Sequence, residues 1–194
     1  MAKARSVDRW KGKEWYTIYA PAMLENKEIA HMLASEDSTL LNRILSVNLS
    51  ELTGDLSQSY TSLIFRITEV KGKSAFTKLI GHALSRSYLQ TLVRRRRNTI
   101  LEVVDAITKD EVKLRVKASI FTGKKVSEEV RRAIRKEARE EIAERAQTME
   151  FDQLEQEIIF KKFSARIYNR IKKLAPIKRV EIGKTEVEEN FRSA

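Results

Sequence analysis

The sequence contains no cysteine, and its 194 residues include only two histidines, two prolines and six glycines. The absence of cysteine excludes disulfides, thiolate metal sites, thiol nucleophiles and iron–sulfur ligation. His31 and His82 each lack a second ligand nearby in the sequence, so we expect both to be structural and no metal to bind. No phosphate-binding loop, dinucleotide glycine motif or nucleophile elbow is present. The sequence therefore favours a protein that is not an enzyme, with no cofactor and no small-molecule substrate.

Long apolar runs are also lacking, since none approaches the roughly 18 residues that a membrane span needs, and the first residues are charged. We therefore expect a cytoplasmic protein that is not inserted in a membrane. Negative charge is in the minority, because 38 Lys and Arg outnumber 27 Asp and Glu for a net charge of +11. Such a surface gains by displacing counterions from phosphates. The charge predicts a polyanionic partner, with nucleic acid favoured over an anionic membrane surface.

Charge and apolar spacing divide the chain into three predicted parts. Residues 1–13 have little apolar content and predict a flexible basic arm that becomes ordered on RNA, where Trp10 can stack on a base. Residues 14–185 predict a single α+β RNA-binding domain whose helical part spans about 126–175. Residues 186–194 predict an acidic tail that frays. The basic residues of the arm are Lys3, Arg5, Arg9, Lys11 and Lys13.

Most apolar residues between positions 14 and 121 recur at every second position, as β-strands require. We expect a meander in which Lys71-Gly72-Lys73 forms one turn and Lys109-Asp110 another, with a short helix capped by Ser87 ahead of the arginines near 94. In the last of these strands, alternate residues from Val112 to Ile120 should point into the core. The predicted strands are 15–20, 43–49, 60–70, 74–80, 99–108 and 111–121.

From Ser127 onward the apolar spacing changes to about four, which predicts a long helix capped by Ser127. A second helix at about 150–161 and a third that ends before Pro176 should follow. A final strand near 177–182 would return to the sheet. The expected fold is therefore α+β, with a β-barrel-like, mostly antiparallel sheet, one inserted helix and a C-terminal helical segment that returns a final strand to the sheet.

Three groups of basic residues are candidates for RNA contact. The first is four consecutive arginines, which would occupy every side of a helix and so belong to an exposed junction; they are Arg94, Arg95, Arg96 and Arg97. The second recurs at helical spacing with few acidic residues on the same helix; it consists of Lys162, Arg166, Arg170 and Lys173. The third lies on one strand face; its residues are Lys113, Arg115 and Lys117. This third group equally suits phosphate binding and protection of a strand edge.

The chain also resembles a known family. Trp15-Tyr16, followed three residues later by Ala20-Pro21-Ala22-Met23, resembles the amino-terminal signature of the small-subunit ribosomal protein family of archaea and eukaryotes historically called S-three-a. Further matches lie at Ser46-Val47-Asn48-Leu49 and at Ile120-Phe121-Thr122, which is followed by the basic Lys124 and Lys125, two more candidates for RNA contact. The resemblance covers essentially the whole chain, and its compact length is similar to the archaeal members.

The resemblance implies a non-catalytic protein on the platform of the small ribosomal subunit, near the messenger RNA exit. It also implies contacts with small-subunit rRNA and neighbouring ribosomal proteins, with messenger RNA nearby. The residues alone support only a basic, non-catalytic nucleic-acid-binding domain. A free-standing RNA- or DNA-binding protein, such as a chaperone or chromatin factor, has the same sequence properties and remains the alternative at this point.

Overall fold

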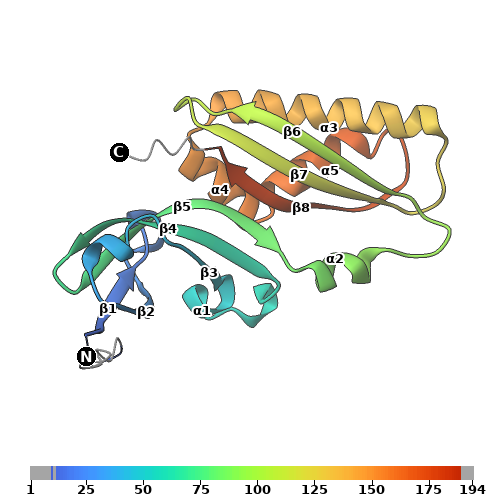
Figure 1. The fold of residues 1–194 in the computed structure, drawn as a ribbon. Helices are drawn as coiled ribbons and strands as arrows, with labels where there is room; N and C mark the ends of the chain where they lie inside the picture. The colour runs from blue at the N-terminus through green and yellow to red at the C-terminus, as the bar shows by residue number, and fades with distance from the viewer. Residues whose placement is uncertain (1–9, 11, 189–194) are drawn as a thin grey trace, which may run out of the picture.

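The computed structural model describes Trp10 and residues 12–188 of the chain. Its strands come mainly first, and three helices precede the last strand (Figure 1). The strands are β1 (Glu14–Tyr19), β2 (Glu28–Ala34), β3 (Ile44–Asn48), β4 (Thr61–Lys71), β5 (Ser74–Leu84), β6 (Thr99–Ile107), β7 (Lys113–Thr122) and β8 (Ile177–Val187). The helices are α1 (Leu49–Thr53), α2 (Arg86–Leu92), α3 (Glu128–Thr148), α4 (Phe151–Ile159) and α5 (Lys162–Ile171), and there are short 3-10 helices at Ala22–Leu24, Asp37–Thr39 and Leu56–Gln58.

The eight strands form one mixed sheet in the order β2-β1-β5-β8-β7-β6, with β4 also paired to β5 and β3 paired to β4. The pairing is antiparallel apart from β1 and β5, which run parallel. β5 carries β1 at its start, through Ser74 to Phe76, and β8 near its end, at Ala83. Its other edge pairs with β4 along most of its length. β5 therefore joins the two parts of the sheet.

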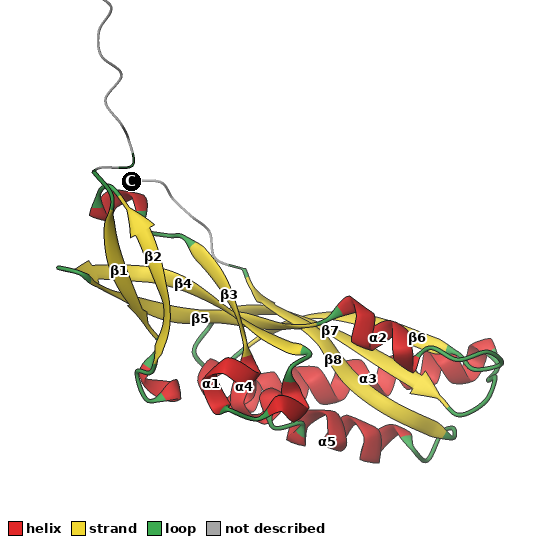
Figure 2. Ribbon diagram, turned by 90° about the horizontal axis from the view of Figure 1, so that it is seen from below, coloured by secondary structure: helices red, strands yellow, loops and turns green. Residues whose placement is uncertain are grey.

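The helices α3, α4 and α5 cover one face of β6, β7 and β8 (Figure 2). Alternate side chains of these strands, such as Ile100 and Val116, are completely buried on that face. Burial of each large aliphatic side chain stabilises the fold by roughly 1.5 to 3 kcal/mol. The buried stripe of α3 consists of Ile134, Ala138, Ile142 and Ala146, and that of α5 includes Phe163, Ile167 and Ile171.

The predicted α+β fold is confirmed, including the inserted helix and the C-terminal strand that returns to a mostly antiparallel sheet. Ser127 caps α3 as predicted, because its side chain accepts a hydrogen bond from the N–H of Val130. The inward face of β7 is also as predicted, although Val112 precedes the strand and is only partly buried. The buried residues of that face are Leu114, Val116, Ala118 and Ile120.

Several local predictions are wrong. The simple meander fails because β1 pairs in parallel with β5, and because β8 enters the sheet between β5 and β7. No strand is predicted for Glu28–Ala34, whose Ala, His and Met have weak strand preference, yet this segment pairs with β1 as β2. Ser85, not Ser87, precedes the first turn of α2, and its side chain makes no capping hydrogen bond.

The end of β8 also differs from the prediction. The strand continues through Val187, although the sequence places the start of a frayed tail at residue 186. Glu186 lies opposite Arg115 of β7, and its Oε2 is 2.9 Å from Nζ of Lys117. Cations on β7 therefore give this acidic residue a partner inside the sheet. Residues 189–194 lie outside the described residues.

Candidate nucleic-acid interface

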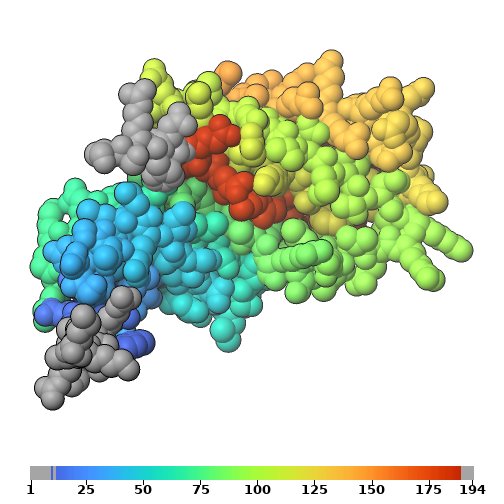
Figure 3. Space-filling view, viewed as in Figure 1, coloured from blue at the N-terminus to red at the C-terminus, as the bar shows by residue number. Residues whose placement is uncertain are grey.

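The arginine run forms the connection between α2 and β6. Helix α2 ends at Leu92, and Arg96 adopts a left-handed backbone conformation with φ of 60°. All four arginines are exposed, and within the described part of the chain none of them forms an ion pair. The light-green surface that contains this connection projects from the right-hand end of the molecule in Figure 3. Four guanidinium groups therefore face solvent and suit phosphate oxygens.

Asn98 ties the arginine run to the loop that follows β7. Its backbone N–H donates to Oγ1 of Thr122 at 2.8 Å, and its side-chain Oδ1 accepts from the N–H of Val126 at 2.9 Å. The loop held in this way contains Lys124 and Lys125, which are both exposed. Two hydrogen bonds thus hold two lysines beside the arginines.

A second contact brings the connection between α5 and β8 to the same place. The N–H of Gly123 donates to the carbonyl oxygen of Pro176 at 2.6 Å, and the exposed Lys172 and Lys173 lie just before this proline. Lys172 is an addition to the predicted set, because it lies off the basic stripe and only the local density of lysines indicated it. We call this group the basic end: Arg94, Arg95, Arg96, Arg97, Lys124, Lys125, Lys172 and Lys173.

Acidic groups do little to neutralise the basic end. The nearest acidic residues along the chain are Glu128 and Glu129 at the start of α3. The carboxylate of Glu128 already pairs with Arg131 and lies 3.5 Å from Nη1 of Arg135. The basic end therefore keeps a local excess of positive charge, which attracts a polyanion over distances set by the ionic strength.

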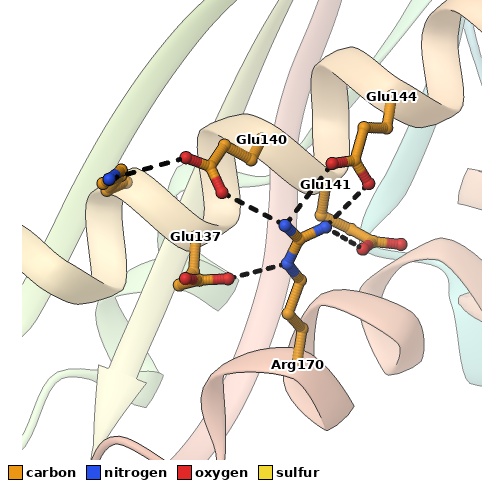
Figure 4. Close-up of polar contacts among 6 residues, drawn as sticks. Glu137, Glu140, Glu141, Glu144 and Arg170 are labelled. Carbon is orange, nitrogen blue, oxygen red and sulfur yellow. Dashed lines mark hydrogen bonds and ion pairs between the residues drawn. The ribbon is translucent and has the colours of Figure 1, made fainter.

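Arg170, a member of the predicted basic stripe, is instead surrounded by carboxylates of α3 (Figure 4). Its Nε donates to Glu137 at 2.8 Å, and its Nη1 donates to Glu141 at 2.9 Å and to Glu144 at 2.8 Å. Nη2 donates to Glu140 at 3.2 Å. The hydrogen bonds that Arg170 donates to Glu144, Glu137 and Glu141 raise the pKa of Arg170 well above its ordinary value. The side chain thus joins α5 to α3, and its donors are occupied.

The rest of the stripe is divided. Arg166 lies 3.7 Å from the carboxylate of Glu157, which also binds Arg145 at 2.8 Å. The hydrogen bond from Arg145 lowers the pKa of Glu157, so this carboxylate stays charged. Lys162 and Lys173 are exposed. The structure therefore does not gather the stripe into one surface, and only Lys173 lies with the basic end.

The basic face of β7 is partly neutralised by its neighbours in the sheet. Nε of Arg115 donates to Asp105 of β6 at 2.6 Å, and its Nη2 lies 2.9 Å from Glu188. Hydrogen bonding from Arg115 lowers the pKa of Asp105, which keeps that carboxylate charged. Lys117 binds Glu186 as described above, whereas Lys113 is exposed. β7 pairs with β6 on one edge and with β8 on the other, so it has no open edge for these cations to protect. Carboxylates of the neighbouring strands hold Arg115 and Lys117, which leaves no free row of cations for phosphates.

The predicted arm is only partly described. Trp10 is 67% exposed, and Nζ of Lys13 lies 4.0 Å from the centre of its ring. Trp15 is also exposed, whereas Tyr16 is buried and its hydroxyl donates to Asp37 at 2.7 Å. Lys3, Arg5, Arg9 and Lys11 lie outside the described residues.

Neither histidine belongs to a metal site in the described part of the chain. His31 lies 2.8 Å from Glu28 on the surface, and His82 is buried against Glu155. Among the described residues, no three His, Asp or Glu side chains are grouped so that they could hold a metal ion. Within the same residues, none of the helices combines the length and the apolar character needed to cross a membrane.

Comparison with known proteins agrees with these features. The model of the ribosomal S3Ae family matches residues 1–190. The small ribosomal subunit protein eS1 of Methanothrix thermoacetophila is 39% identical over 183 residues, which cover 94% of this chain and 87% of that protein. The eS1 proteins of Archaeoglobus fulgidus and Saccharolobus islandicus are 39% and 36% identical, over 95% and 93% of this chain and 88% and 86% of theirs. The chain belongs to the ribosomal S3Ae family, among its archaeal-type members.

Proposed function

We propose that this protein is a structural component of the small ribosomal subunit that binds small-subunit rRNA through the basic end. Its relatives are named as small ribosomal subunit proteins, and the matches cover nearly the whole chain. The observation that carries the RNA contact is the convergence of three connections, from α2–β6, β7–α3 and α5–β8, on one end of the molecule. Together they present eight exposed cations, of which none has a carboxylate partner among the described residues.

Within the subunit, we place the protein on the platform near the messenger RNA exit, beside other ribosomal proteins, in the cytoplasm. This location follows from the family resemblance. The role is structural: the cations neutralise rRNA phosphates and the folded sheet positions them. Lys113, Lys162 and the arm residues remain predicted secondary contacts, whereas we assign Arg170 to the packing of α5 on α3.

Replacing Arg94, Arg95, Arg96 and Arg97 with alanine tests this function. The variant should bind small-subunit rRNA more weakly than the parent, and the slope of log K against log salt should become shallower by about 3 to 4. The fold should persist, because exposed side chains away from the core contribute little to stability. Filter binding across a salt series measures the slope, and circular dichroism checks the fold.

A matched control removes four positive charges from elsewhere. Lys27, Lys71, Lys73 and Lys184 each pair with a glutamate, so they gain less from a phosphate. Their replacement by alanine should change the salt slope much less. Equal losses in the two variants would show that net charge alone drives binding, and that the basic end is not the interface. Co-sedimentation of the parent with small subunits at high salt separates ribosome assembly from the free-standing alternative.

A further inference from the structure

The outer edge of β6 has no partner strand. β6 is the last strand of the path through the sheet, so no strand of the described residues pairs with that edge. Its other edge pairs with β7 along the entire strand, from Thr99 opposite Phe121 to Ile107 opposite Lys113. An open edge of this length is a template for another strand, and proteins usually block such edges.

Hydrogen bonds beyond both ends of β6 show which backbone groups point outward. The N–H of Thr122 donates to the carbonyl of Asn98 at 3.0 Å, and the N–H of Thr108 donates to the carbonyl of Val112 at 3.0 Å. Both bonds belong to the alternating ladder in which the backbone N–H and C=O groups of the even-numbered residues in this segment point toward β7. The N–H and C=O groups of the odd-numbered residues therefore point to the open edge. They belong to Thr99, Leu101, Val103, Asp105 and Ile107.

The side chains of these odd-numbered residues share the face of the sheet away from α3. Leu101, Val103 and Ile107 are 64%, 52% and 54% exposed, so three of the five side chains on this strand face are apolar and open to solvent, which is unusual. Leu101 and Val103 also line a groove of about 330 Å³, together with Leu89 of α2 and Gly183 of β8. The open edge is therefore bordered by an apolar surface on this face.

The opposite face of the same edge is bordered by arginines. Glu102 of β6 points toward α3, where it accepts a hydrogen bond from Nη2 of Arg139 at 2.6 Å and lies 4.0 Å from Nε of Arg135. The Arg139 side chain is 63% exposed and that of Arg135 is 36% exposed, whereas Glu102 is buried. Arg135 also lies 3.5 Å from Glu128, which pairs with Arg131, so three guanidiniums share two carboxylates on this side of the edge.

We propose that the open edge of β6 binds an extended segment of another protein in which apolar and acidic side chains alternate. Successive side chains of a strand point to opposite faces, so the apolar ones would lie beside Leu101 and Val103 and the acidic ones beside Arg135 and Arg139. A second copy of this chain fits poorly, because each copy carries a net charge of +11. This partner site is separate from the basic end and does not depend on RNA binding.

The test uses the full chain and a capped peptide as long as β6, with valine and glutamate alternating. Two control peptides replace glutamate with lysine, or carry N-methyl groups on the backbone nitrogens of one edge. The first peptide should bind and slow amide exchange at Leu101, Val103, Asp105 and Ile107, because its backbone supplies their missing partners. Amides of the even-numbered residues, already bonded to β7, should change little. Equal binding of either control peptide would overturn the proposal.

A variant locates the site on the protein. Val103→Pro removes an outward N–H, and proline is tolerated at sheet edges, so peptide affinity should fall by about tenfold or more while the fold persists. Val103→Thr keeps the N–H and should bind nearly as well as the parent. If Val103→Pro fails to fold, the N-methylated peptide decides alone. The proposal would also be overturned if sedimentation showed that self-association protects the odd-numbered amides. Protection of these amides by RNA instead of the peptide would overturn it as well.

Discussion

His82 and Glu155 form a buried ion pair, with Nδ1 of the imidazole 3.2 Å from Oε2 of the carboxylate. Nε2 lies 3.1 Å from the carbonyl of Ile182, which only accepts, so Nε2 carries a proton. The hydroxyl of Thr185 gives its single proton to Glu155, so its contact with Nδ1 at 2.8 Å places a proton on Nδ1 as well. An imidazole that donates from both nitrogens is positively charged. This pair ties α4 to β5 and β8.

The charged state of His82 predicts how stability depends on pH. Burial lowers the pKa of His82, but attraction and hydrogen bonding by Glu155 outweigh it, so the pKa is raised above 6.5. As pH rises, His82 loses its proton in the unfolded chain before it does so in the folded protein. The stability that His82 contributes is therefore complete below about pH 6.5, and it is lost as pH rises through the higher pKa of the folded state. Urea unfolding from pH 5.5 to 9 should show this loss.

Two variants assign that pH dependence. Glu155→Gln should remove it and should destabilise the protein by roughly 3 to 5 kcal/mol at pH 6, because a buried charge loses its partner. His31→Gln changes the other histidine, which is exposed beside Glu28, and should leave the effect in place. Stability that increases between pH 6.5 and 9 in the parent would contradict the assignment.

Gly81 should not accept a side chain. Its φ is +152°, and a Cβ atom there would lie 2.2 Å from the backbone oxygen of Thr185 on β8. Gly81→Ala should therefore lower the free energy of unfolding by roughly 2 to 5 kcal/mol, from strain together with the clash. Gly72→Ala is the control, since its φ is +60° with open space around it, and it should cost only about 1 kcal/mol. Similar losses in both would show that the contact with Thr185 relaxes easily.

Arg170 should affect stability and not RNA binding. Arg170→Ala leaves the four carboxylates of α3 without their shared cation, so it should lower the free energy of unfolding by roughly 1 to 2 kcal/mol. The slope of RNA affinity against salt should remain that of the parent, because the donors of Arg170 are occupied. Lys173→Ala provides the comparison, with an expected slope change of about 1 and little effect on urea unfolding. If Arg170→Ala instead made the salt slope shallower and left urea unfolding unchanged, Arg170 would belong to the RNA interface.

The arm should add to RNA affinity. Deletion of residues 1–9 removes Lys3, Arg5 and Arg9, and we expect the salt slope to become shallower by about 2 to 3. Replacing these three residues with glutamine in the full-length chain should have a similar effect, because charge is the property that matters. An unchanged salt slope in both variants would show that the arm does not contact RNA. Filter binding on small-subunit rRNA measures both.

Elements with a long, regular apolar period could be predicted from the sequence. The spacing of four in α3 and the alternation in β7 each require one buried face, and local sequence is enough to define it. β2 could not be predicted, because Ala34 is its one buried residue and its stability comes from pairing with β1. The run of four arginines indicated an exposed junction, but not the lysines that Asn98 and Pro176 bring beside it.

The sequence by itself determined the charge excess, the absence of thiol chemistry, the faces of the regular elements and the family. Only the tertiary structure decided which cations are free. Arg170 and Lys173 lie three residues apart at the end of the same helical segment, yet Arg170 meets four glutamates of α3 and Lys173 meets solvent. A basic side chain is neutralised by carboxylates within a few ångströms, and such neighbours come from segments distant in the chain. Their positions become known only when α3, α5 and the sheet are packed together.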